Sequence, residues 1–264
     1  RPVNPPAPRR LAFPVTPAIA CLAGESGEAP DAGGGPRGER VAAVGRALLP
    51  NVAAVYGLGD VRLFTPMAPA SYLELLRPGI ASWSGEIPLL DGDGLGRLPL
   101  YDRLAVTRVL TAPAAPCPPG TRELCAGSDA RVCERPGALP LLRLERDGEE
   151  AAAPPAGSKP AALPLALEAP RADAGGDRWS AGVPGAAWGT LTTGLYAAPG
   201  WRVLADGRRL EIPEAGDAPL LSARVPPGTA RLELLYRPAG FLLGLLGGAL
   251  GLSLVVAWLA RPPS

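Results

Sequence analysis

Residues 239–260 read AGFLLGLLGGALGLSLVVAWLA, a run of 22 residues with no charged side chain and Ser253 as its one polar side chain. An α-helix rises about 1.5 Å per residue, so this run covers roughly 33 Å, enough for the hydrocarbon core of a bilayer. Arg237 and Arg261 bracket the run, and Trp258 lies near one end, where an indole suits the headgroup layer. The run predicts one transmembrane helix; a buried helix of a soluble domain is the alternative.

The chain just before this helix has the pattern of an antiparallel sheet. Leu232 and Leu234 alternate with charged residues, as expected for a strand with one buried face and one wet face. Upstream, Asp206-Gly207 separates two alternating stretches and favours a two-residue hairpin, because both central residues need positive φ. Residues 126–238 are therefore predicted to form a β-sandwich that leads directly into the membrane helix.

The first half of the chain predicts a smaller lobe with both helices and strands. Residues 106–111 alternate β-branched and polar side chains like a strand, and residues 69–78 have a helical apolar face between two prolines. Residues 41–125 are interpreted as a mixed α/β lobe, and residues 1–40 as an irregular N-terminal segment rich in proline and glycine. The predicted fold class is α+β: this lobe, then an antiparallel β-sandwich, then one transmembrane helix.

Composition excludes several function classes. The chain has 264 residues, a net charge of +1 and no histidine. Without a basic excess to neutralise phosphates, nucleic acid is not expected as a partner. Without histidine, neither a Ser-His-Asp nor a Cys-His nucleophilic site can form. The sequence predicts no metal site and no cofactor, since neither the cysteine spacing nor the acidic residues follow a metal-ligand pattern.

The four cysteines are expected to form disulfides. Cys117, Cys125 and Cys133 lie eight residues apart, and Cys21 stands alone upstream. An even number of cysteines in a chain outside a membrane favours disulfides over free thiols, which would be expected in the cytosol. A turn-like stretch between Cys125 and Cys133 favours pairing across a hairpin, which leaves Cys21 with Cys117. Four cysteines allow three pairings, and the other two stay open.

One loop gathers side chains that suit a sugar or a phosphate. Asn51, Tyr56, Asp60 and Arg62 provide an amide, a phenol, a carboxylate and a guanidinium within a short stretch. Arginine grips phosphate with two parallel hydrogen bonds, so these residues are the candidates for substrate binding. A structural ion pair between Asp60 and Arg62 is the alternative. No catalytic residue is assigned.

Four sets of residues follow one another in a fixed order: PNVAAVYGLGDVR at 50–62 followed by residues 66–76; LAVTRVL at 104–110; VCERPGALP at 132–140; and APGWRVLADG at 198–207 with PPG at 226–228 and LYRPAGF at 235–241. Together they resemble the C-terminal region of the bacterial YfhO-type polytopic membrane proteins. The resemblance covers roughly residues 50–259. It implies a glycosyltransferase-like membrane core that uses lipid-linked sugars, with the catalytic acid in an early loop that this chain lacks.

The resemblance also implies where the chain acts and with what. We expect it to be the extracytoplasmic C-terminal domain and last helix of such a protein in the bacterial cytoplasmic membrane, accessory rather than catalytic in cell-envelope glycosylation. Its expected partners are the lipid bilayer, the N-terminal transmembrane core of the same protein, and a lipid-linked sugar or envelope glycan. The alternative is a non-catalytic, membrane-anchored β-sandwich that binds glycan or braces a membrane complex.

Overall fold

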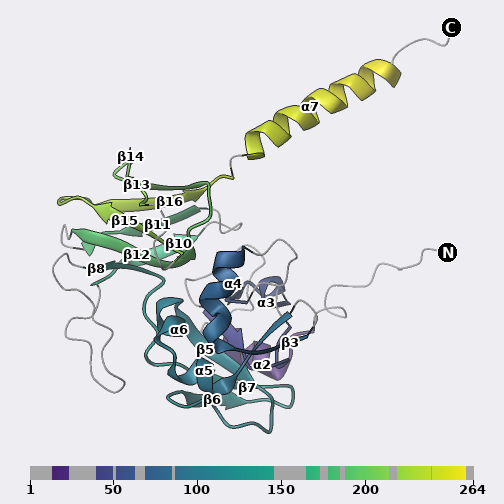
Figure 1. The fold of residues 1–264 in the computed structure, drawn as a ribbon, viewed down its shortest axis with the longest axis vertical. Coiled ribbons are helices and arrows are strands. Elements are labelled where there is room, and N and C mark those ends of the chain that lie inside the picture. Colours follow the sequence, from purple (N-terminus) through teal and green to yellow (C-terminus); the bar gives the residue numbers. More distant parts are fainter. Residues whose placement is uncertain are drawn as a thin grey trace.

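The computed structural model describes residues 14–23, 40–49, 52–62, 69–84, 87–145, 165–172, 178–184, 188–213, 219–238 and 240–259, with the backbone alone at 165–166, 168–172, 241–243 and 254–259. These residues form two lobes and a C-terminal helix (Figure 1). The chain is a mixed α/β protein with several antiparallel sheets and few helices.

The first lobe is built on a mixed five-stranded sheet. Its strands lie in the order β2 (Gly59–Asp60), β1 (Arg40–Ala43), β5 (Val106–Thr111), β7 (Arg131–Glu134) and β6 (Arg122–Ala126). β1 runs parallel to β2 and β5, whereas the β5–β7 and β7–β6 pairs are antiparallel. A hairpin of β3 (Ile80–Ser84) and β4 (Ile87–Leu90) joins the end of β1 through a bridge between Val44 and Leu90.

Short helices cover this sheet. They are α2 (Pro17–Ala23), α3 (Val52–Val55), α4 (Ala70–Leu76) with a 3₁₀ turn η1 (Arg77–Gly79), α5 (Gly92–Arg97) and α6 (Pro99–Arg103). Their ends follow ordinary capping rules: the Asp91 carboxylate accepts a hydrogen bond from the Gly94 N–H, and Pro99 opens α6, where no N–H is needed. Leu76, Leu95 and Tyr101 are fully buried beneath them.

The prediction of an irregular N-terminal segment is wrong for the part that the structure describes, because α2 is a helix. Ala18 and Ile19 are buried, and Ala18 packs with Leu110 and Val132 against the sheet. The Asp129 carboxylate accepts a hydrogen bond from the Ala18 N–H at 3.2 Å. Tertiary contacts therefore hold a helix that the local composition does not predict.

The second lobe is an antiparallel β-sandwich, as the sequence predicts. One sheet has the order β10 (Glu168–Ala172), β11 (Arg178–Gly182), β16 (Arg231–Tyr236), β13 (Trp201–Ala205) and β14 (Arg208–Arg209). The other has the order β15 (Leu220–Val225), β12 (Gly189–Tyr196), β8 (Leu142–Glu145) and β9 (Leu165–Ala166). Side chains of both sheets meet in one core that includes Leu144, Leu191, Val203, Leu221 and Leu234.

The hairpin expected at Asp206-Gly207 is confirmed. The two residues have φ of +48° and +80°, and β13 and β14 pair on either side of them. The expected boundary at residues 125/126, in contrast, passes through a sheet, because β7 belongs to the first lobe and the sandwich begins at β8. Cross-strand hydrogen bonds from β5 and β6 hold β7 in the first lobe.

The two lobes pack directly on each other. Arg40 Nη1 donates to the Gly194 carbonyl at 2.7 Å, and the rings of Tyr72 and Tyr196 meet edge to face with centroids 5.6 Å apart. Leu220 of the sandwich is buried in the core of the first lobe. A Cβ added to Gly194 would lie 3.1 Å from the Arg103 carbonyl oxygen, so glycine permits this close approach.

Helix α7 (Gly240–Leu259) follows β16 after three residues and extends away from both lobes in Figure 1. Leu245, Leu246, Leu250 and Leu252 are 61–67% exposed. Across the residues that the structure describes, no helix is identified as long and apolar enough to cross a membrane. The transmembrane helix expected from the sequence therefore stays a prediction.

Replacing Gly194 by alanine should destabilise the contact between the lobes. The new methyl group would meet backbone atoms of Arg103 and Leu104 at 3.1 Å, and backbone cannot move aside cheaply. We expect a loss of about 1–3 kcal/mol in the free energy of unfolding, measured by chemical denaturation. Gly92→Ala is the matched control, since its Cβ would meet neighbours at an ordinary 3.9 Å. Equal stability of the two variants would contradict the tight contact.

Candidate functional site

Asp60 and Arg62 form a buried ion pair at the end of β2. Arg62 Nη2 lies 2.8 Å from Asp60 Oδ2, and Arg62 Nε donates to Oδ1 at 3.1 Å. The backbone N–H of Arg62 also donates to Asp60 Oδ1, at 2.8 Å. The two side chains are only 0% and 4% exposed, for Arg62 and Asp60 respectively. A bidentate pair of this kind is geometrically strong but leaves little surface for a ligand.

The rest of the guanidinium of Arg62 is used by the backbone after β1. Nη2 donates to the Leu48 carbonyl at 2.7 Å, and Nη1 donates to the Gly45 carbonyl at 3.4 Å. Arg62 therefore ties the turn that follows β1 to the neighbouring strand β2. Buried carbonyl groups need such donors, because an unpaired one costs free energy comparable to a lost hydrogen bond.

The other two predicted ligand residues do not join this pair in the described part of the chain. The Tyr56 hydroxyl donates to the Pro14 carbonyl at 2.9 Å, which fastens the N-terminal segment to the loop after α3. Asn51 lies outside the described residues. The geometry thus favours the structural alternative for Asp60 and Arg62 over phosphate binding, and a ligand role for the four residues stays a prediction.

Two buried tyrosines that the sequence did not single out lie close to this loop. The Tyr72 hydroxyl donates to the Val61 carbonyl at 2.7 Å, between the two members of the ion pair. Burial raises the pKa of Tyr72, opposed by the nearby charge of Arg40, and burial also raises the pKa of Tyr101. Both phenols therefore stay protonated at neutral pH and supply no general base there.

Buried arginines act as structural clamps elsewhere too. Arg135 Nε donates to Asp102 at 2.6 Å while its other nitrogens donate to the Leu95 and Leu98 carbonyls. Arg143 is 1% exposed and donates to Glu145 and to backbone carbonyls. Arginine is suited to this use because its fork offers five donors in fixed directions. Within the described residues, no group of three or more histidine, cysteine or acidic side chains could hold a metal ion.

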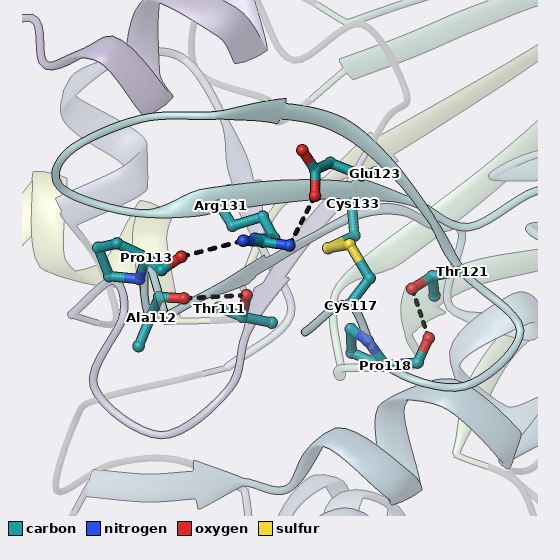
Figure 2. The surroundings of a disulfide bond; sticks show 9 residues. All are labelled: Thr111, Ala112, Pro113, Cys117, Pro118, Thr121, Glu123, Arg131 and Cys133. Carbon is teal, nitrogen blue, oxygen red and sulfur yellow. Dashed lines mark hydrogen bonds and ion pairs between the residues drawn. A yellow bond between two sulfur atoms is a disulfide. The ribbon is translucent and has the colours of Figure 1, made fainter. Parts of the chain in front are cut away.

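All four cysteines lie in two disulfides, but the expected pairing is wrong. Cys21 of α2 bonds Cys125 of β6, and Cys117 bonds Cys133 of β7. Figure 2 shows the second bond beneath β7, with Arg131 held nearby between the Glu123 carboxylate and the Pro113 carbonyl. The Cα atoms are 6.7 Å apart in the first pair and 5.8 Å in the second.

Strand alternation explains why Cys125 and Cys133 do not meet. They lie on adjacent strands, yet Cys125 is opposite Val132, the residue before Cys133. Successive residues of a strand point to opposite faces, so Cys125 and Val132 share one face and Cys133 takes the other. Cys21 packs on the first face and Cys117 on the second.

Comparisons with protein-family models, with curated proteins and with solved structures found no match for this chain.

Removing the Asp60 carboxylate should make the protein easier to unfold, because the buried positive charge of Arg62 then has no ion-pair partner. We expect Asp60→Ala to lower the free energy of unfolding by about 3–5 kcal/mol in urea denaturation. The double variant Asp60→Ala/Arg62→Met should lose less than the sum of the single losses. The exposed pair of Glu74 and Arg77 is the matched control, and Glu74→Ala should change stability little. A stable Asp60→Ala would instead point to a ligand role.

Peptide mapping under non-reducing conditions should find Cys21 linked to Cys125 and Cys117 linked to Cys133. Trypsin cleaves after Arg122 and Arg131, which places Cys117, Cys125 and Cys133 on separate peptides. The sequence separations are 104 and 16 residues. Loop entropy then predicts that removing the disulfides costs about 4.7 and about 3 kcal/mol respectively. A peptide linking Cys125 to Cys133 would refute this pairing.

Proposed function

We propose that this chain is a non-catalytic, extracytoplasmic module of a bacterial membrane protein, anchored by α7. In this proposal it serves as the C-terminal domain and last helix of a YfhO-like glycosyltransferase that uses lipid-linked sugars for cell-envelope glycosylation. Its role is to hold the outer part of that enzyme in place against the membrane core. The chemistry itself belongs to the core.

The observation that carries the proposal is the direct continuation of β16 into α7. Only residues 237–239 lie between the last strand of the sandwich and a 20-residue helix of apolar sequence. The proposal that this helix spans a bilayer rests on the sequence, because the uncharged run of residues 239–260 would rise roughly 33 Å as a helix, about the hydrocarbon thickness of a bilayer. In water, the exposed leucines of α7 would form a contiguous apolar patch, and monomeric soluble proteins rarely expose a large one.

The disulfides support a position outside the cytoplasm. Both bonds lie in the first lobe and hold α2 and the loop before β6 against the sheet. Disulfides persist in oxidising compartments and are rare in the cytosol. Since α7 follows the sandwich immediately, both lobes would then lie on the outer surface of the cytoplasmic membrane.

The accessory role is supported by what the buried charged groups do. The guanidinium of Arg62 is occupied by Asp60 and by two backbone carbonyls, which suits a rigid domain more than a binding loop. This same observation favours a second candidate, a membrane-anchored module that braces a complex or binds glycan without any link to sugar transfer. The two candidates differ in whether anchoring of the chain affects glycosylation.

A charge placed in α7 should test both the anchor and the function. Leu250→Arg puts an arginine in the middle of the helix, where insertion is costly, so we expect this 264-residue chain, expressed without any membrane core, to be released by alkaline washing of membranes. Leu49→Arg, at a leucine 51% exposed and outside α7, is the matched control and should stay membrane-bound.

Cell membranes that also contain the membrane core distinguish the two candidates. For the glycosyltransferase role, transfer of labelled sugar from a lipid-linked donor to envelope glycan should fall with Leu250→Arg and stay normal with Leu49→Arg. Normal transfer with Leu250→Arg would leave only the bracing or glycan-binding module. Release of the unmodified chain by alkali would refute the membrane anchor in both candidates.

A further inference from the structure

A cleft opens at the end of the sandwich from which α7 departs. It has a volume of about 660 Å³ and lies between residues 197–201 and residues 209–213, with Leu221 at its floor. The Gly200 carbonyl accepts a hydrogen bond from the Arg237 N–H at 3.0 Å, so the rim of the cleft is tied to the segment that enters α7. The cleft therefore lies beside the anchor.

Aromatic side chains mark the same end of the sandwich. The Trp201 ring lines the cleft and packs on Tyr236, the last residue of β16, with centroids 5.1 Å apart. The Trp201 indole N–H donates to the Tyr196 carbonyl at 3.0 Å, which fixes the ring. Tryptophan and tyrosine are enriched at the level of lipid headgroups. If α7 spans the membrane, this cleft lies at that level.

The cleft presents one positive and one negative side chain. Arg209 and Glu211 both line it and are both exposed. Neither has a hydrogen-bond or ion-pair partner among the described residues. Leu210 lies between them, and its N–H donates to the Val203 carbonyl at 2.8 Å, which continues the strand pairing beyond β14. Two residues of extended chain span about 6.6 Å, so both charges can reach one small ligand.

We propose that this cleft binds the headgroup of an aminophospholipid of the surrounding bilayer, with the phosphate at Arg209 and the primary ammonium at Glu211. The ligand class is a phosphoethanolamine headgroup. This inference rests on the proposed placement of α7 in the membrane and adds a lipid site to it.

Charge complementarity selects this headgroup over the other common ones. A phosphoglycerol headgroup has no cation, so beside Glu211 it offers only neutral hydroxyl groups and no ion pair. A phosphocholine headgroup has a cation without N–H donors, so it cannot make a hydrogen bond to the carboxylate. The ammonium of phosphoethanolamine has a positive charge and N–H donors, so it can form an ion pair and a hydrogen bond with Glu211. The nearby indole of Trp201 also attracts a cation.

The test is a binding titration with the full chain in amphipol, using short-chain phosphatidylethanolamine, phosphatidylglycerol and phosphatidylcholine and isothermal calorimetry. We expect phosphatidylethanolamine to bind about tenfold more tightly than the other two, the factor that one charge-assisted hydrogen bond supplies. Arg209→Gln should weaken the binding of all three lipids. Glu211→Gln should remove the preference for phosphatidylethanolamine. Arg208→Gln, at the neighbouring exposed arginine that does not line the cleft, should change neither.

Two results would overturn the inference. One is an unmodified chain that binds phosphatidylglycerol or phosphatidylcholine as tightly as phosphatidylethanolamine. The other is an Arg209→Gln variant that behaves like Arg208→Gln. Because the lipids are offered outside a bilayer, failure here is separate from failure of α7 to insert. If alkali releases the unmodified chain from membranes but the chain still prefers phosphatidylethanolamine, the anchor is refuted. If the chain stays in membranes but shows no preference among the lipids, the lipid site is refuted.

Discussion

The buried guanidinium of Arg62 is the interaction on which the arrangement of the first lobe depends. It binds Asp60 on β2 and the carbonyl groups that follow β1, so it holds the turn after β1 against the end of β2. The Val61 carbonyl, between Asp60 and Arg62, accepts a hydrogen bond from the hydroxyl of Tyr72, whose ring meets Tyr196 of the sandwich. A buried guanidinium without partners would destabilise the fold. The charge of Arg62 is tolerated because almost all of its N–H groups donate hydrogen bonds.

The contacts continue from that aromatic pair to the end of the chain. The Tyr196 carbonyl accepts the indole N–H of Trp201, and Trp201 packs on Tyr236 just before α7. Gly194 lies on β12, two residues before Tyr196, and allows the backbones of the two lobes to approach closely. The two lobes and the segment that leads into α7 are thus joined by packed side chains as well as by the chain. Such a body suits a module that holds a position beside a membrane, which is the role we propose.

Several features could be predicted from the sequence because they depend on neighbours along the chain. The Asp206-Gly207 hairpin follows from the need for positive φ, and β5 and β16 follow from alternation of apolar and polar residues. For the candidate site, the sequence brought Asp60 and Arg62 forward as candidate ligand residues and also as a structural ion pair, and the structure shows the ion pair. Their burial depends on Gly45 and Leu48, which lie 17 and 14 residues away from Arg62.

By itself the sequence determined the sandwich with its one-sided strands, the count of cysteines available for disulfides, and the apolar run of α7. Only the tertiary structure decided the cysteine partners, the helical state of α2 and the interior position of Arg62. Alternation and turn chemistry act over a few residues, so they are readable locally. Which face of β6 meets α2, and which carbonyl groups need a buried donor, depend on how distant segments pack, and no local pattern contains that information.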